Sequence, residues 1–440
     1  QSNLEKSGIP TVTIVTDPFL TLSRGTQKSQ GLTDMCFVTV PHPLGMISKE
    51  EVNAKVDAAF DDIVKAATAW TPSKEKQDAQ VKPYPAKRFK FSGTYADVND
   101  MFQKRKWSLS LPIVPPTVDK VAAMLKGTKR NPAEVLWVVP PRQGMLTVEL
   151  VAALGVMAGA KPEHMPLLIA TVEAMADPVA AWRGPTTTTA ATVPVFFISG
   201  PIIEKLKLNP GTGTAGGENP VTNALGYFVN LVGDVVGGSV PPNFDKSTHG
   251  SSADLVAMVF TENAKENPWK TTYAEEAGFK PGDSIVTHFS AYLGNANIDH
   301  DSKTGQRLLT TLSTGLLGSA SGLASCLADY DATYAINNKV SFAFIVLCPE
   351  HAATIAKDFP DQRAARDFMR ETAAMPYKFY SQETCVPGKD FGPYDENTFI
   401  PRFKKTESIK FFVSGGPGKQ SQFWVPFPQV LKPVSTKIAE

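Results

Sequence analysis

The stretch that decides the fold runs from Glu134 to Pro178 and reads EVLWVVPPRQGMLTVELVAALGVMAGAKPEHMPLLIATVEAMADP. Its β-branched and aromatic run Val135–Val139 predicts a buried strand. Prolines at 140–141 cannot donate ladder hydrogen bonds, so they end the strand and predict a turn over residues 142–144. Two apolar helical stretches follow, separated by a break at 159–162. A basic, polar turn between a buried strand and a buried helix indicates an α/β fold with a ligand site there.

The composition is that of an ordinary globular protein. A chain of 440 residues exceeds one ordinary core, so we expect two or three domains. Hydrophobic residues make up 42%, charged residues 20%, and the net charge is +1. No concentrated basic excess is present, so we expect no nucleic-acid binding. No apolar run approaches the ~20 residues that cross a bilayer, so we expect no membrane span.

The start of the chain and its cysteines favour a cytoplasmic protein. The opening QSNLEKSGIP lacks the regions of a signal peptide. The four cysteines lie far apart without paired spacing, which favours reduced thiols. The chain opens without Met on what reads as a helix end, so we expect a processed chain or a subunit.

The chain divides into three parts. Residues 1–70 predict a small, incomplete α/β domain, and residues 71–117, rich in Pro, Lys and aromatics, predict a linker or wrapping arm. Residues 118–440 predict a larger α/β or α+β domain that could divide into two subdomains, and they show no internal repeat. The expected strands are 10–16, 35–40, 193–198, 257–261, 284–289, 342–347 and 409–413. The expected helices are 19–30, 48–68, 117–126, 223–236, 305–318 and 352–358.

Two glycine-rich segments are candidate anion sites. Residues 209–219 contain G-x-G-x-x-G, with Gly211 and Gly213 as its first two glycines, but a helix end rather than a strand precedes them. A backbone-amide cradle at a helix N-terminus, with Asn219 and Asn223, and a plain loop are both more consistent with this context than a dinucleotide fingerprint. In the segment 414–421, Lys419 accompanies a possible backbone nest whose glycine spacing fails the phosphate-loop pattern, and a strand-to-strand turn is the alternative.

The histidines give no strong metal pattern. His288, His300 and Asp301 could supply nitrogen and oxygen ligands, although their spacing matches no zinc motif and a solvated turn is the alternative. His42 lies between two prolines at the end of a strand, where catalytic side chains often project. A structural histidine is an equally good interpretation of His42.

The cysteines divide by context. Cys36, Cys326 and Cys348 have apolar neighbours and are expected to be core thiols. Cys385 lies in the polar loop QETCVPGKDFG, where a nearby lysine would favour a thiolate, and an inert loop cysteine is the alternative.

The segments GIPTVTIVTDPF and VTVPHPLGMISKEEV resemble the second half of the UGSC family of (seleno)proteins. In that family a motif of selenocysteine or cysteine, glycine, serine and cysteine precedes this region by a helix. The rest of the chain resembles the larger protein associated with that family. That resemblance rests on the segments VPPRQGMLTVELVAALGVMAGAKPEHMPLLIATVEAM, NPGTGTAGGENPVTNALG, ENPWKTTYAEEAGF, CPEHAATIAKDF and VSGGPGKQSQFWVP. One departure is Ala160, where a cysteine would be expected.

The resemblance implies the large subunit of a heteromeric enzyme whose reactive thiol or selenol lies on a small partner chain. In this hypothesis Arg142 and Gln143 bind a small anionic substrate, His42, Glu149 and Cys385 are the candidate catalytic residues, and the glycine loops donate amides. The expected chemistry is reductive or carbon–heteroatom bond cleavage.

Two alternatives come from other classes of protein. One is a metal-dependent hydrolase or lyase, in which cysteines of a partner segment or residues near His300 bind a transition metal. The other is a non-catalytic binding or assembly subunit, whose arm 71–117 wraps a neighbour in a homo- or hetero-oligomer.

Overall fold

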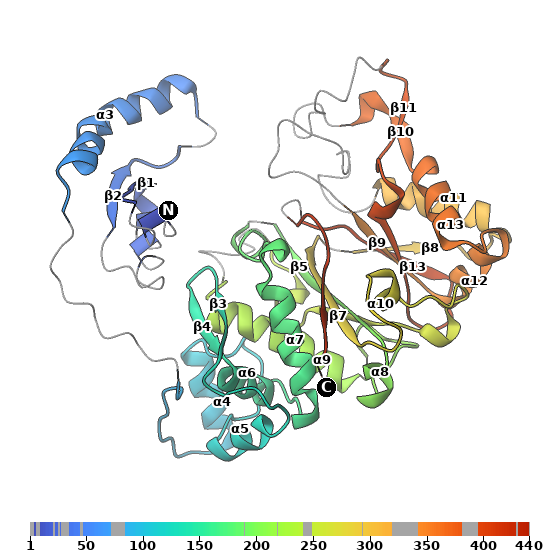
Figure 1. Cartoon of the computed structure of the whole chain (residues 1–440), viewed down its shortest axis with the longest axis horizontal. Helices are drawn as coiled ribbons and strands as arrows, with labels where there is room; N and C mark the ends of the chain where they lie inside the picture. The colour runs from blue at the N-terminus through green and yellow to red at the C-terminus, as the bar shows by residue number, and fades with distance from the viewer. Residues whose placement is uncertain are drawn as a thin grey trace.

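The computed structural model describes most of the chain (Figure 1). The described residues are 4–5, 9–20, 23–24, 27, 35–44, 47–71, 84–188, 190–217, 219–240, 249–292, 294–318, 342–380, 395–427 and 430–439. Helices and sheets are mixed throughout them, which confirms the α/β class.

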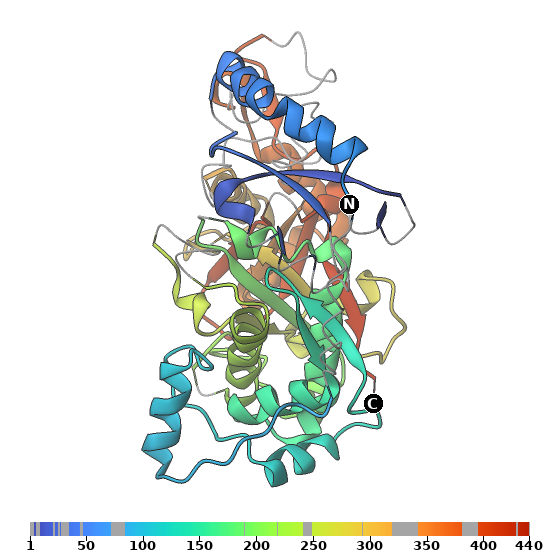
Figure 2. The same ribbon diagram turned by 90° about the vertical axis from the view of Figure 1, so that its left-hand side faces the viewer.

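The N-terminal unit consists of two parallel strands and a long helix. Strands β1 (Val12–Thr16) and β2 (Cys36–Val40) pair in register, and α3 (Lys49–Thr68) packs on them (Figure 2). Ser48 caps α3 and exchanges hydrogen bonds with Glu51 in a capping box, as the spacing of the two residues predicts. The expected helix 19–30 falls largely outside the described residues.

From residue 84 onward, the segment expected to be a linker or arm packs on the chain's own core. It contains the helix α4 (Tyr95–Lys104), whose capping box joins Thr94 to Asp97. Phe102 of this helix and Ile113 after it are buried among the helices that follow. The first of these is α5 (Val118–Leu125), which contacts α6.

The fold-deciding stretch forms a hairpin followed by two buried helices. Strand β3 (Val135–Val139) pairs antiparallel with β4 (Gly144–Thr147), and α6 (Val148–Met157) and α7 (Met165–Ala176) follow. The expectation of a buried strand that turns directly into a helix was wrong in two respects. The turn joins two strands, and β3 is partly exposed, because its only sheet partner among the described residues is β4.

The larger body contains two four-stranded sheets within its described residues. In the first sheet the strand order is β6 (Met258–Thr261), β5 (Val193–Ser199), β7 (Ile285–Ala291) and β14 (Val434–Lys437). Strands β5 and β6 are parallel, while β7 is antiparallel to both β5 and β14.

The second sheet repeats this pattern of pairing. Its order is β12 (Ile409–Val413), β9 (Ala343–Leu347), β13 (Gln420–Trp424) and β8 (Asn295–Ile298). Strands β9 and β12 are parallel, while β13 is antiparallel to both β9 and β8. Three strands also follow the same chain order, because β5, β6 and β7 correspond to β9, β12 and β13. The structure therefore contains a topological repeat that the sequence does not show.

Helices fill the crossovers in both repeats. In the first, α8 (Ile202–Lys205), α9 (Pro220–Asn230) and a π-helical turn, η5 (Leu231–Val236), connect β5 to β6. The short α10 (Tyr273–Glu276) precedes β7.

In the second repeat, α11 (Gly305–Gly318) precedes β9. Helices α12 (Pro349–Asp358) and α13 (Gln362–Thr372) connect β9 to β12. A small antiparallel pair, β10 (Ala374–Pro376) and β11 (Phe399–Pro401), lies beside them.

The two sheets pack face to face between two layers of helices (Figure 1). Alternate residues of β5 divide between two cores: Phe196 and Ile198 pack with α6, α7 and α9, whereas Val195 and Phe197 face the second sheet. The central strand β13 (QSQFW) carries polar residues and was not predicted. Because both faces of β5 and β9 are buried, these central strands are nearly continuous apolar runs rather than alternating ones. This explains why the apolar runs β5, β6, β7, β9 and β12 were predicted correctly to within one or two residues.

Phe197 is at the centre of the contact between the sheets. Its ring centroid lies 4.5 Å from that of Phe344 and 4.9 Å from that of Phe412, both in the second sheet. Two isolated β-bridges, Glu262–Ser414 and Ala291–Pro426, also join the sheets. Each bridge connects the ends of strands that correspond in the two repeats.

Replacing Phe197 by Ala should lower the free energy of unfolding by about 3–5 kcal/mol, because it empties the centre of the aromatic contact. Denaturant unfolding of the full chain would measure the change. The matched control is Phe379→Ala, since Phe379 is 61% exposed and should contribute little. Equal effects of the two substitutions would contradict the placement of Phe197.

Candidate functional site

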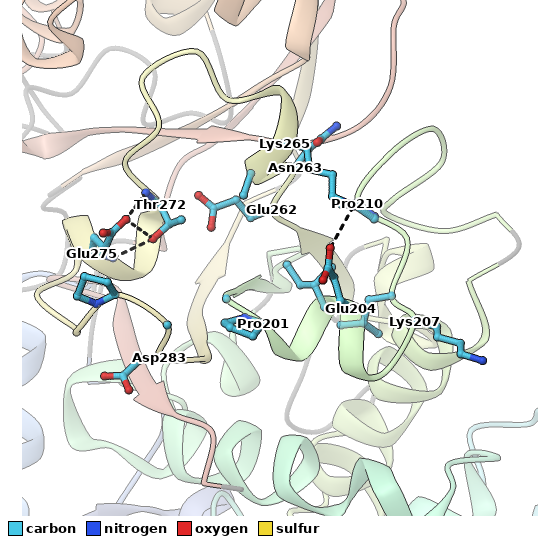
Figure 3. Close-up of a pocket in the computed structure, with 16 residues that line it drawn as sticks. Pro201, Glu204, Lys207, Pro210, Glu262, Asn263, Lys265, Thr272, Glu275 and Asp283 are labelled. Carbon is cyan, nitrogen blue, oxygen red and sulfur yellow. Dashed lines mark hydrogen bonds and ion pairs between the residues drawn. The ribbon is translucent and has the colours of Figure 1, made fainter.

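A cavity of about 520 Å³ opens where the parallel strands β5 and β6 end (Figure 3). The carboxyl ends of parallel strands are where α/β proteins commonly bind ligands. The cavity is also within the usual volume range of small-molecule sites. It is lined by Gly200, Pro201, Ile203, Glu204, Lys207, Leu208, Pro210, Glu262, Asn263, Ala264, Lys265, Thr272, Glu275, Pro281, Gly282 and Asp283.

Glu262, the residue directly after β6, brings a buried carboxyl group to this cavity. Its side chain is only 3% exposed. One carboxylate oxygen accepts a hydrogen bond of 2.7 Å from the backbone N–H of Tyr273. The other accepts from the hydroxyl of Ser199, the last residue of β5. The hydroxyl of Ser199 accepts a hydrogen bond in turn from the N–H of Ala274. The end of β5, the end of β6 and the short helix at residues 273–276 therefore hold the carboxyl group in a fixed orientation.

Burial raises the pKa of Glu262 from 4.5 to about 7. The hydrogen bonds from Ser199 and Tyr273 oppose this shift, while the charges of Glu275 and Glu276 add to it. A carboxyl group with a pKa near neutral pH can both donate and accept a proton, which is the requirement for general acid–base catalysis. Perturbed carboxyls in cavities are candidates for this role.

The charged groups at the rim are largely paired. Lys265 lies 3.0 Å from Glu204, and both side chains are exposed. The ammonium of Lys437 lowers the pKa of Asp283. Glu275 caps α10 by accepting hydrogen bonds from Thr272, which lower its pKa.

The two glycine-rich segments meet beside this cavity. Pro210, at the start of the first segment, accepts a hydrogen bond of 2.9 Å from the N–H of Gly415 in the second. A side chain at Gly416 would collide with Thr212, since a Cβ there would lie 2.1 Å from its hydroxyl oxygen. The first segment is also fixed to β6, because Thr261 donates a hydrogen bond of 2.6 Å to the carbonyl of Asn209. Gly416 therefore allows the two glycine-rich segments to pack closely at the side of the cavity that Pro210 lines.

The first glycine segment satisfies much of its own hydrogen bonding. The N–H of Gly211 donates to the side chain of Asn209, and Asn223 donates to the carbonyl of Gly217. Gly213 has a left-handed φ of 74°. Asn219 begins α9 and is 2% exposed, and its side-chain amide nitrogen has no hydrogen-bond partner. As expected, a helix end (α8) and not a strand directly precedes this segment.

The second glycine segment does form a nest, and the chain fills it with its own carboxylate. Glu350 accepts hydrogen bonds of 2.7 Å from the N–H of Gly418 and 3.0 Å from that of Lys419. The ammonium of Lys419 donates to the carbonyl of His300. The predicted anion site at Lys419 thus holds an internal anion in this structure.

Glu149 lies away from the cavity and holds the N-terminal part of the body in place. Glu149 is 5% exposed. Its carboxylate accepts a hydrogen bond of 2.7 Å from the N–H of Ala86 and another of 3.2 Å from the guanidinium of Arg88. Glu149, which was predicted to be a catalytic residue, therefore anchors the segment that begins at residue 84.

The predicted turn at Arg142 and Gln143 borders a second cavity of about 580 Å³. Gln143 lines it together with Trp137 and Trp182, whose rings meet edge to face. Arg142 is not among the lining residues, because its stem passes over Gly238, where an added Cβ would lie 2.2 Å from the Arg142 Cδ.

His42 belongs to the N-terminal unit. Its Nδ1 lies 3.1 Å from the hydroxyl of Thr16, and its ring packs against Phe19. His42 does not line the cavity at Glu262.

The three predicted metal ligands are not brought together. His288 is fully buried on β7, where its ring stacks on Phe196 and burial lowers its pKa to about 3. His300 and Asp301 lie after β8 in the other sheet. Within the part of the chain that the structure describes, no three His, Cys, Asp or Glu side chains are grouped as metal ligands.

The cysteines add no exposed thiol in the described ranges. Cys36 and Cys348 are buried thiols, as predicted, and burial raises the pKa of Cys348. Cys326 and the catalytic candidate Cys385 lie outside the described residues.

Glu262 and Ser199 were not among the residues predicted from the sequence, although a signal for both is present there. Each is the polar residue at the carboxyl end of a correctly predicted apolar strand. Examining the first polar residue after every parallel strand would have selected both.

Residues 2–69 match the family model described as the UGSC family. This match covers the N-terminal unit and confirms the resemblance there. A search of the curated proteins finds no match to this chain. None of the helices in the described residues is long and apolar enough to span a membrane.

Glu262 should make the stability of the protein depend on pH. Its folded pKa of about 7 exceeds its ordinary value, so the folded state keeps a proton that the unfolded state loses, and stability falls as pH rises between the two values. Relative to Glu262→Gln, the free energy of unfolding of the wild-type protein should fall by roughly 3 kcal/mol from pH 4.5 to pH 8. Urea unfolding of both proteins across this range measures the difference, and parallel curves would refute the shift.

Proposed function

We propose that this chain is the substrate-binding subunit of an enzyme that acts on a small molecule, with Glu262 as the group that transfers protons. The observation that carries the proposal is the buried carboxyl of Glu262 at the wall of a ligand-sized cavity. General acids and bases work best when their pKa is close to the working pH, and burial moves Glu262 into that range.

Ser199 acts in this proposal as a positioning residue. Its side chain is fully buried, so its hydroxyl cannot serve as an accessible nucleophile. It donates to Glu262 and accepts from the N–H of Ala274, which fixes the direction in which the carboxyl presents its remaining lone pairs.

The substrate is unidentified, so the test uses a complete metabolite extract. Wild-type protein, Glu262→Gln and the surface control Glu50→Gln would each be purified from the native source together with any bound partner chain and incubated with the extract, and consumed metabolites would be followed by mass spectrometry. We expect at least one metabolite to be consumed by the wild type and the control, with a loss on the order of 10²-fold or more in the Glu262 variant. Equal turnover by all three, or none by any, would contradict the proposal.

We further propose that a reactive thiol or selenol is supplied by a partner segment, for reductive or carbon–heteroatom bond cleavage. Support comes from the UGSC match at residues 2–69 and from the burial of the described cysteines. The β1–β2 pair is a third argument, because the sheet has only these two strands among the described residues, and a two-stranded sheet is marginal and favours addition of another strand. A metal-dependent hydrolase or lyase with a transition metal on partner cysteines is the alternative reaction class.

Native mass spectrometry of the protein purified from its source would test for this partner. The expected result is a complex containing a small chain with a cysteine- or selenocysteine-containing motif. Elemental analysis of the same sample separates thiol chemistry from metal chemistry. Finding this chain only by itself, with full activity, would refute the partner.

A further inference from the structure

The charged groups at the cavity beside Glu262 are unevenly arranged. Its lining includes four carboxylates, Glu204, Glu262, Glu275 and Asp283, against two ammonium groups, Lys207 and Lys265. Lys265 is 83% exposed and pairs with Glu204 at the rim. Figure 3 shows Lys207 extending away from the other lining side chains. Asp283 pairs with Lys437 at 2.5 Å, and Glu275 accepts the capping hydrogen bonds of Thr272, so Glu262 is the buried carboxyl group of the lining that no lining ammonium faces.

Apart from Asn263 and Thr272, the remaining walls are largely apolar. Pro201, Ile203, Leu208, Pro210 and Pro281 supply hydrocarbon surface, and Ile203 and Leu208 are themselves nearly buried. An apolar lining with a few convergent polar groups is typical of a site that encloses the body of a small molecule and orients it by one polar group.

We propose that this cavity binds a small organic cation, a primary or secondary ammonium on a hydrocarbon body, with the ammonium at Glu262 and the body against the proline-rich wall. The inference rests on the proposed function for the location of the site and adds the class of substrate. The anionic substrate expected from the sequence was assigned to Arg142, Gln143 and the glycine-rich segments, and none of the residues named for it lines this cavity.

The geometry of Glu262 suits this ligand. Each carboxylate oxygen receives one hydrogen bond from the protein, from Tyr273 or Ser199, while a carboxylate offers about four lone-pair sites. A primary ammonium has three donors and a secondary one has two, and either would use the remaining lone-pair sites in a poorly hydrated environment, where charge pairing is stronger than in water. A carboxylate or phosphate ligand would instead face repulsion from Glu262 and Glu275.

The test compares three probes of nearly equal shape: n-hexylammonium, 1-hexanol and hexanoate. Calorimetry with the full wild-type chain at pH 8 should give a dissociation constant for hexylammonium about 10-fold or more below those of the other two. Affinity for hexylammonium should fall as pH falls below about 7, because Glu262 must release its proton to pair with the cation.

Matched variants locate the effect. Glu262→Gln should remove the preference for hexylammonium. Glu275→Gln should weaken it by a smaller factor, since glutamine can retain the capping box with Thr272 while removing the charge. The control Glu50→Gln, on α3, should bind as the wild type does.

Each outcome decides the question. Equal or tighter binding of hexanoate, no binding of any probe, or an unchanged preference in Glu262→Gln would overturn the cationic class. If hexylammonium fails while a metabolite is still consumed in a Glu262-dependent manner, the enzymatic proposal stands with an uncharged or anionic substrate. If hexylammonium binds but no metabolite is consumed, the cavity is a cation-binding site and the enzymatic proposal fails.

Discussion

The face-to-face contact of the two β-sheets, centred on Phe197, is the constraint on which the rest of the structure depends. It requires the two facing sides of the sheets to be apolar, and it places the ends of β6 and β12 together at the Glu262–Ser414 bridge. A carboxylate at that bridge cannot be fully hydrated. The position that gives Glu262 its raised pKa is therefore a consequence of how the two halves pack.

The topological repeat gives this position a counterpart. Ser414 follows β12 as Glu262 follows β6, and the two residues pair across the junction. The halves nevertheless differ at their open edges. In the second half the nest at Gly418 and Lys419 is filled by the carboxylate of Glu350, whereas in the first half a ligand-sized cavity stays open beside Glu262. The same arrangement of strands thus has an internal carboxylate in the loop of the second half and an open cavity at the strand ends of the first half.

The sequence predicted the apolar strands well, but it missed β8, β13 and β14 of the two main sheets and predicted the site poorly, for physical reasons. Strands buried on both faces are continuous apolar runs, so β5, β9 and β12 are visible locally. Strand β4 was missed because its four residues directly precede an apolar helix, and the repeat was missed because only its pairing pattern is shared. Functional positions depend on contacts between distant segments. Glu149 and Lys419 have suitable chemistry, but their partners, Ala86 and the carbonyl of His300, can only be identified in the folded chain.

The central claim is that the carboxyl of Glu262 changes its protonation near neutral pH. The most direct test is a titration of ¹³C-labelled glutamate carboxyls by nuclear magnetic resonance, in which the Glu262 signal is assigned from its absence in Glu262→Gln. The account predicts a midpoint at about pH 7. A midpoint near the ordinary value of 4.5 would contradict it and leave the cavity without a group suited to proton transfer.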